Sequence, residues 1–101
     1  MSVADYRRGI SSHDETIVAG TKLYLKGVGL GMVIVNAAAS RDNKQMFCQP
    51  AKLTLETQNF LNILNEMITD LSTKTSVAKV DAMEAELVLF IGLQKTFPCA
   101  N

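Results

Sequence analysis

The sequence predicts an all-α fold, a small bundle of four to five helices with one disulfide in a single domain, residues 1–101. Apolar residues recur at helical spacing over most of the chain, and no segment alternates apolar and polar residues as a half-buried strand does. The two prolines, Pro50 and Pro98, leave long stretches free to be helical. With 48 % hydrophobic and 20 % charged residues, the chain has the composition of a globular protein with one modest core.

The N-terminal part is predicted to form a short helix over residues 3–10 and a long helix over residues 14–40. Asp14 and Glu15 suit the positive end of the long helix's dipole. Its most apolar stretch, residues 27–39, is shorter than the roughly 20 residues that a bilayer span needs, so we expect no transmembrane helix. The first eight residues contain two arginines with no apolar run after them, and we expect no secretory signal in this sequence.

Four glycines stand in the long helix, and each costs about 1 kcal/mol of helix propensity relative to alanine. Gly27-Val28-Gly29-Leu30-Gly31 has some likeness to a nucleotide-binding loop, but the GxGxxG spacing is incomplete and no strand precedes it. We favour helix packing instead. Gly27 and Gly31 lie four residues apart on one helix face, where missing side chains let another backbone approach closely. Such a contact would offset the propensity cost.

The C-terminal part is predicted to form two helices joined by a surface loop. Residues 54–71 place apolar side chains on one face and polar side chains on the other. Residues 72–76, Ser-Thr-Lys-Thr-Ser, contain no apolar side chain and are predicted to be a loop. A last helix is predicted over residues 80–96, with Lys95 near its C-terminal end and Pro98 ending it.

The chain has few groups suited to catalysis or metal binding. His13, the single histidine, lies in a polar stretch, where a turn beside a helix start is a simpler interpretation than a catalytic base. Two distant cysteines and one histidine give none of the spacings of a zinc site. Glu84 and Glu86 are expected on different helix faces, so they would not converge on one atom. We therefore predict no catalytic, metal or cofactor site, and no enzyme activity.

The balance of charges narrows the class of partner. Ten basic residues balance ten acidic ones without a basic block, so we expect binding neither to nucleic acid nor to an anionic membrane.

Cys48 precedes the third predicted helix and Cys99 follows the fourth. A bridge between them would tie two antiparallel helices together and contribute roughly 4 kcal/mol in the chain-entropy model. Two unpaired, buried thiols in a cytosolic protein are the alternative.

Several short motifs, taken together, resemble one known family. They are Tyr24-Leu25-Lys26-Gly27 with Gly31, Phe47-Cys48-Gln49-Pro50, Gln58, and Phe97-Pro98-Cys99. Their order and spacing from Leu23 to Cys99 resemble the Rap/Tai family of type VI secretion immunity proteins. Two features depart from that family: a further cysteine that many members carry near the N-terminus is absent, and the residues before Asp14 show no match.

The resemblance implies a small helical bundle with a disulfide between Cys48 and Cys99. It implies a periplasmic protein of a Gram-negative bacterium, whose signal peptide is absent from this sequence. The implied function is to bind a peptidoglycan amidase effector of the type VI secretion system and to inhibit it by occluding the active-site cleft. A homodimer without a cofactor is also implied.

The loop and the helix ends beside it are our candidate for the element that enters the amidase cleft, because a short loop held by two rigid helices loses little entropy on binding. The candidate residues are Asp70, Ser72, Thr73, Lys74, Thr75, Ser76 and Lys79. An ordinary helix connection is the alternative interpretation of this segment. Two other functions stay open: a small periplasmic chaperone of the acid-stress kind, and a cysteine-dependent enzyme that uses Cys48 or Cys99.

Overall fold

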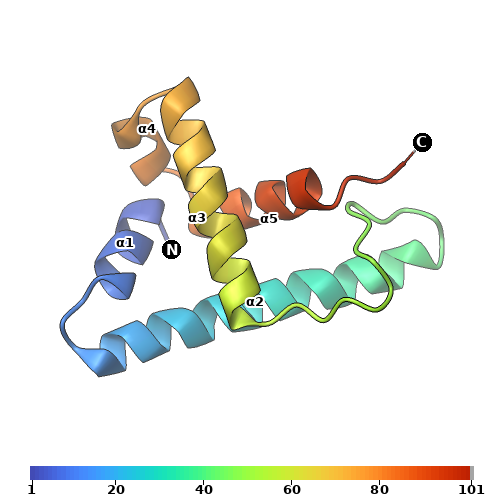
Figure 1. The fold of residues 1–101 in the computed structure, drawn as a ribbon, viewed down its shortest axis with the longest axis horizontal. Helices are drawn as coiled ribbons and strands as arrows, with labels where there is room; N and C mark the ends of the chain where they lie inside the picture. The colour runs from blue at the N-terminus through green and yellow to red at the C-terminus, as the bar shows by residue number, and fades with distance from the viewer. Residues whose placement is uncertain (101) are drawn as a thin grey trace.

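A computed structural model describes residues 1–100 of the chain. This part forms five helices and no strand: α1 (Val3–Ile10), α2 (Glu15–Ser40), α3 (Thr57–Lys74), α4 (Val77–Asp81) and α5 (Ala85–Thr96). Figure 1 shows α2 along the lower edge of the molecule and α3 crossing it steeply. The molecule is flat, with extents of 43 × 31 × 18 Å. The all-α prediction is confirmed.

Polar side chains begin the first two helices close to the predicted positions. The Ser2 hydroxyl accepts a hydrogen bond from the Asp5 N–H at 3.0 Å, and the Asp5 carboxylate accepts one from the Ser2 N–H at 3.4 Å. This reciprocal pair is a capping box. The Asp14 carboxylate accepts from the Thr16 N–H at 2.9 Å and caps α2. The two predicted helices are therefore confirmed to within one residue.

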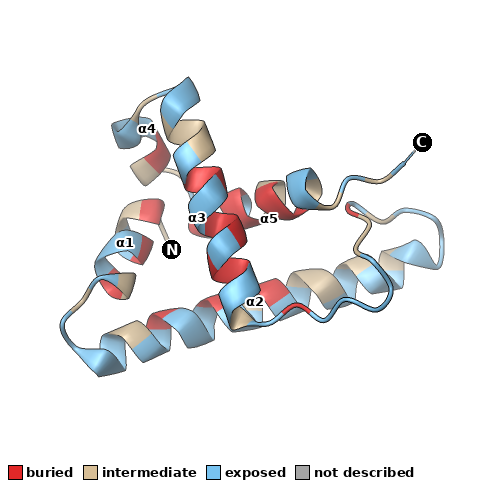
Figure 2. Ribbon diagram, viewed as in Figure 1, coloured by how far each residue is buried: buried red, intermediate tan, exposed pale blue. Residues whose placement is uncertain are grey.

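The centre of the core is α3, which packs against both α2 and α5. Its buried side chains are Phe60, Leu61, Ile63, Leu64, Met67 and Ile68. From α5, Val88, Leu89 and Leu93 are fully buried. Figure 2 shows the buried residues concentrated on α3 and α5, whereas most of α2 is exposed. The core is thus built mainly by the C-terminal half of the chain.

Close helix packing occurs at Gly29 and Gly92 rather than at Gly27 and Gly31. A Cβ atom at Gly29 would lie 2.6 Å from the Phe60 ring, and one at Gly92 would lie 2.7 Å from a side chain of α3. At Gly27 and Gly31 a Cβ atom would have no such neighbour within 4 Å. The close packing expected of these two glycines is therefore not made within residues 1–100, because both are exposed on the side of α2 that faces away from α3.

The loop predicted over residues 72–76 is mostly helical, which corrects the sequence prediction. α3 continues to Lys74, and only Thr75 and Ser76 connect it to α4. The hydroxyls of Ser72 and Thr75 donate to backbone carbonyls one turn earlier, at 2.7 and 3.0 Å. Lys74 pairs with an aspartate one turn earlier. These polar side chains thus bond along the helix and let it continue.

The helix predicted over residues 80–96 is divided into α4 and α5. α5 begins at Ala85, after a turn that the first residues of the chain contact. The N–H of Val3 donates to the carbonyl of Met83 at 2.9 Å, and the N–H of Ala85 donates to the carbonyl of Met1 at 2.8 Å. These bonds join residues far apart in the sequence, so a search for local periodicity does not detect the interruption.

Glu84 and Glu86 converge, and the expectation that they do not is wrong. Both carboxylates accept from the Met1 amino group, at 3.1 Å for Glu84 and 2.9 Å for Glu86. Glu84 is the N-cap of α5 and lies outside the helix, so the argument from helix faces does not apply to it. Glu86 also accepts from the Tyr24 hydroxyl at 2.5 Å, which connects α5 to α2.

By length and composition alone, α2 is able to cross a membrane. The helix has 26 residues, and its most apolar 18-residue stretch has a mean hydropathy of 1.4 and is only 17 % buried. The sequence analysis counted only residues 27–39 and so underestimated the length of the apolar segment, because the residues before Lys26 belong to the same helix. Most of α2 therefore lies at the surface.

We predict that Gly29→Ala destabilises the fold, although alanine is the better helix former. The new Cβ must displace the Phe60 ring, and overpacking of this kind costs about 1–3 kcal/mol. Gly31→Ala is the matched control on the same helix. Because its Cβ meets open space, it should raise the free energy of unfolding by about 0.5–1 kcal/mol. Urea unfolding at low protein concentration measures both, and an undiminished stability of Gly29→Ala would contradict the packing.

Candidate functional site

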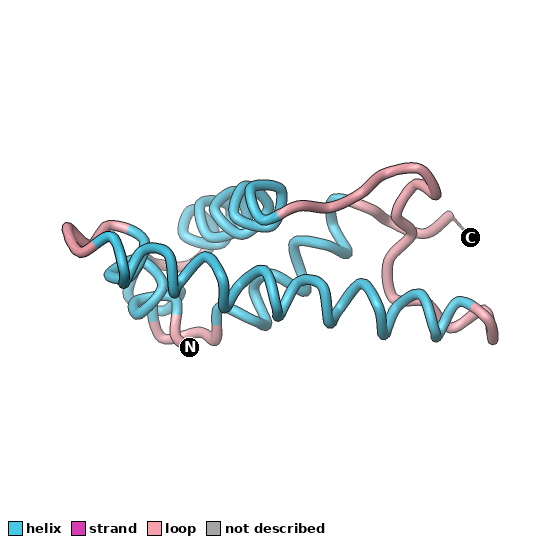
Figure 3. Tube along the Cα trace, turned by 90° about the horizontal axis from the view of Figure 1, so that it is seen from below, coloured by secondary structure: helices cyan, strands magenta, loops and turns pink. Residues whose placement is uncertain are grey.

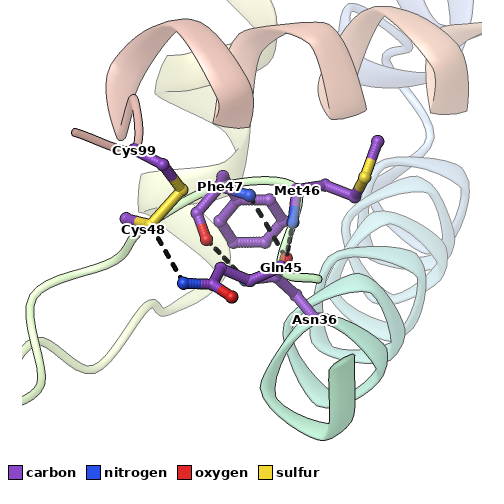
Figure 4. The surroundings of a disulfide bond; sticks show 6 residues. All are labelled: Asn36, Gln45, Met46, Phe47, Cys48 and Cys99. Atoms are coloured by element: carbon purple, nitrogen blue, oxygen red, sulfur yellow. Dashed lines mark hydrogen bonds between the residues drawn. A yellow bond between two sulfur atoms is a disulfide. The ribbon is translucent and has the colours of Figure 1, made fainter. Parts of the chain in front are cut away.

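A disulfide joins Cys48 to Cys99, with the sulfur atoms 2.04 Å apart and the Cα atoms 4.9 Å apart. The predicted bridge is confirmed, and neither cysteine is a free thiol in this structure. The N–H of Cys48 also donates to the carbonyl of Phe97 at 2.7 Å. The segments Cys48-Gln49-Pro50 and Phe97-Pro98-Cys99 therefore form one structural unit (Figure 4).

The bridge indicates the kind of compartment in which this protein is stable. Disulfides persist in oxidising compartments outside the cytoplasm, whereas cytosolic reductants keep thiols reduced. The Cys48–Cys99 bond is consistent with such an oxidising, extracytoplasmic environment. The alternative of two unpaired thiols does not apply to this structure.

Asn36 of α2 holds the loop that carries Cys48. Its Oδ1 accepts from the backbone N–H groups of Met46 and Phe47, at 2.6 and 3.2 Å. Its Nδ2 donates to the carbonyl of Phe47 at 2.8 Å, and Figure 4 shows the side chain reaching from α2 to this loop. The sequence prediction missed this role. The available signal was a single amide in an apolar helix that is followed by a polar loop.

The predicted effector-binding residues surround the turn between α3 and α4. We define the α3–α4 corner by Asp70, Ser72, Thr73, Lys74, Thr75, Ser76 and Lys79. Thr73, Lys74, Thr75 and Lys79 are exposed, and the other three are half-buried. Figure 1 places this corner at the upper end of α3, away from α2. The candidate residues thus share one end of the molecule, on helix ends rather than on a loop.

Hydrogen bonds hold both sides of the α3–α4 corner. The N–H of Thr75 donates to the carbonyl of Leu71 at 3.0 Å where α3 ends. The Ser76 hydroxyl accepts from the N–H of Lys79 at 3.2 Å and caps α4. Because only two residues connect the capped helices, the corner is ordered before any partner binds.

Asp70 forms ion pairs with two lysines at the base of the α3–α4 corner. Its Oδ2 accepts from Nζ of Lys95 at 2.8 Å and from Nζ of Lys74 at 3.1 Å. These hydrogen bonds, that of Lys95 first, lower the pKa of Asp70 below its ordinary value. In return, the bond to Asp70 raises the pKa of Lys95. Since Lys95 belongs to α5, this ion pair also connects the corner to α5.

No further cluster suited to chemistry was found within residues 1–100. No group of three or more His, Cys, Asp or Glu side chains in that range is placed to hold a metal ion. His13 is exposed in the connection between α1 and α2. Comparison with protein-family models, with curated proteins and with solved structures finds no match. The resemblance to the Rap/Tai family rests on the motif residues alone.

We expect Cys48→Ser and Cys99→Ser each to lower the free energy of unfolding by about 2–5 kcal/mol, the usual range for a native bridge in a small secreted domain. The double variant is the control, because two changes that act only through one shared bond should cost no more together than singly, within about 0.5 kcal/mol. Urea unfolding measures all three variants. Reduction should add about 2 Da to the intact mass, and an unchanged mass would show that the bridge does not form.

We predict that Asp70 titrates at a lower pH in the folded protein than in the unfolded chain. Because the folded pKa is lowered, the ion pairs contribute stability above the unfolded value near 3.8 and lose it as the pH falls through the folded pKa. Lys95→Gln should move the Asp70 pKa back toward its ordinary value. Lys79→Gln keeps both ion pairs and should not. Titration of the Asp70 carboxyl by NMR tests this, and an equal response to both variants would contradict the contact.

Proposed function

We propose that this chain is a periplasmic immunity protein that binds a peptidoglycan amidase effector of the type VI secretion system and occludes its active-site cleft. One observation carries the proposal. The segments Cys48-Gln49-Pro50 and Phe97-Pro98-Cys99, which bear the more specific part of the Rap/Tai resemblance, are joined in one unit although their cysteines are 51 positions apart. Their contact supports treating the two motifs as parts of one pattern rather than as separate coincidences.

The α3–α4 corner is the proposed inhibitory element. It projects at one end of the molecule, and its exposed groups are hydroxyls and ammonium groups from Thr73, Lys74, Thr75 and Lys79. Such donors suit a polar cleft that contains a catalytic cysteine and histidine. Because capped helices order the corner in advance, little entropy is lost on insertion. Inhibition then requires occupation of the cleft alone, with no chemical change in either protein.

A second candidate is a small periplasmic chaperone of the acid-stress kind, which the exposed apolar side of α2 favours. Leu23, Ile34 and Val35 are 69 %, 68 % and 69 % exposed, and exposed apolar patches are surfaces that bind other proteins. Binding of an apolar dye as a function of pH separates the two functions. A rise in dye fluorescence below about pH 4, where carboxylates become protonated, supports the chaperone. An unchanged signal supports the immunity function.

We predict that the oxidised protein inhibits a cysteine–histidine peptidoglycan amidase stoichiometrically and reversibly. One cleft accepts one corner, so residual activity should fall linearly with added protein and reach zero near one corner per enzyme. The release of soluble peptidoglycan fragments gives the readout. If no candidate amidase is bound at micromolar concentration, the immunity function is wrong and the chaperone becomes the leading candidate.

The corner itself is tested with matched charge changes. Lys74→Glu combined with Lys79→Glu should weaken amidase binding by about 10- to 100-fold, since both lysines would face the enzyme. Lys44→Glu combined with Lys52→Glu makes the same change of charge at exposed loop positions and should leave binding intact. Both variants should keep the helical circular-dichroism signal. Equal affinities of the two variants would show that another surface binds the amidase.

A further inference from the structure

α2 presents large apolar side chains to solvent over most of its length. We define the outer face of α2 by six exposed residues: Ile17, Leu23, Tyr24, Leu30, Ile34 and Val35. Figure 3, which views the molecule from below, shows α2 in front and extended along the whole length of the structure. An exposed apolar surface of this length marks a site that binds a protein or a membrane. The charges and contacts around it distinguish between these two kinds of partner.

Between its two ends, the α2 segment carries basic residues only. The chain has no acidic residue between Glu15 and Asp42, which stand at the start of α2 and just beyond its end. The same stretch has three basic residues, Lys22, Lys26 and Arg41, all of them exposed. At 100° per residue the two lysines lie along one margin of the outer face, where their stems cover apolar surface and their ammonium groups reach outward. The whole chain is neutral, which led us to expect no anionic membrane as a partner, but this edge of the molecule is locally basic.

Tyr24 and Glu86 form the opposite margin of the outer face. The Tyr24 side chain is 42 % exposed, and its hydroxyl donates to the Glu86 carboxylate of α5 at 2.5 Å. Tyrosine is enriched at membrane–water interfaces, because its ring suits the apolar side of the boundary and its hydroxyl suits the polar side. The Glu86 carboxylate also accepts from the Met1 amino group at 2.9 Å. Its negative charge is therefore balanced within the fold and repels an anionic surface little.

An apolar groove continues the outer face toward α5. It has a volume of about 340 Å³, and its walls include Met32 and Val35 of α2, Met46 of the following loop and Phe90 of α5. Val35 belongs to both the groove and the outer face. The one polar side chain that lines the groove, Asn36, is already bonded to the loop backbone. The groove therefore offers contacts to hydrocarbon, and an acyl chain is a ligand that needs no other contact.

We propose that the outer face of α2 binds the surface of a phospholipid bilayer that contains anionic lipids. In this arrangement the large apolar side chains enter the boundary between headgroups and acyl chains, and the three basic residues meet lipid phosphates. The helix lies along the bilayer rather than across it, because Thr21, Leu25 and Gly29 on its inner side are buried against the rest of the fold. The α3–α4 corner lies away from α2 and stays accessible (Figure 1). Membrane binding goes beyond the proposed function and does not depend on it.

A lipid surface fits the charges of this edge better than a second protein helix does. Where helices pair, cations beside an apolar seam commonly face acidic residues of the partner helix. A second copy of α2 has no acidic residue between its ends to face Lys22 or Lys26. Anionic lipids supply phosphates along the whole stretch from residue 22 to 41, which is roughly 28 Å long at 1.5 Å per residue. The bilayer thus satisfies both the apolar face and its basic margin.

Tryptophan fluorescence tests which side of the molecule enters the membrane. The chain has no tryptophan, so an introduced one is the only emitter of its kind. With vesicles of phosphatidylethanolamine and phosphatidylglycerol, the emission of Leu23→Trp and of Ile34→Trp should shift to shorter wavelength and be quenched by lipids brominated on their acyl chains. Val77→Trp is the matched control at an exposed apolar position of α4 and should show neither change. Quenching of Val77→Trp as strong as that of Leu23→Trp would overturn the assignment to the outer face.

Co-sedimentation with the same vesicles tests the basic margin. Lys22→Gln combined with Lys26→Gln should weaken vesicle binding by about tenfold or more, because each lysine near an anionic surface contributes to the attraction. Lys74→Gln combined with Lys79→Gln removes the same charge at the α3–α4 corner and should bind vesicles as the wild type does. An equal loss in both double variants would show that binding follows net charge alone, which overturns the proposal.

Apolar contact is tested with neutral substitutions. Leu23→Gln combined with Ile34→Gln should lose most of the vesicle binding, whereas Val77→Gln should keep it. Sedimentation without lipid identifies the competing occupant. A wild-type chain that binds no vesicles, but forms a dimer that the Leu23→Gln and Ile34→Gln pair dissociates, would assign the outer face to a second copy and overturn the proposal. No amidase is used in these measurements, so their failure and the failure of the proposed function are separate results.

Discussion

The close approach of α3 to α2 at Gly29 is the contact on which the arrangement of the helices depends. The Phe60 ring occupies the space that a side chain at residue 29 would fill, so the two helices pack directly at their crossing. A close contact of the same kind, in which a side chain fills the space beside a glycine, occurs where α5 meets α3 at Gly92. Because the resulting structure is only 18 Å thick, α2 has one side against the core and the opposite side in solvent.

The disulfide end of the molecule is held by a different set of bonds. Loop residues near Cys48 are tied to the segment that follows α5 through the bridge and the Phe97 carbonyl, and to α2 through Asn36. A covalent bond and a buried aromatic ring, that of Phe47, thus order a long connection with little regular structure. The bond is stable only where thiols are oxidised, which relates this part of the fold to its compartment.

Two surfaces of opposite character lie at opposite edges of the structure. The α3–α4 corner is polar, short and held by caps, whereas the side of α2 that carries exposed Leu23, Ile34 and Val35 is long and apolar. A polar corner suits a hydrated cleft, whereas an exposed apolar helix face suits an apolar partner surface. Since the two surfaces do not overlap, the proposed insertion of the corner into a cleft leaves the exposed side of α2 accessible.

Local pattern was sufficient for the features that depend on neighbours in the sequence. Periodicity and the Asp14 cap located α1 and α2 almost to the residue, and the positions of the cysteines allowed the bridge that the structure contains. Tertiary contacts decided the rest. Three glycines alternate over residues 27–31, and only the placement of Phe60 determines that the middle one packs. Likewise, the turn before α5 depends on backbone bonds from the first residues of the chain. Periodicity is a property of adjacent residues, whereas these choices depend on partners dozens of positions away.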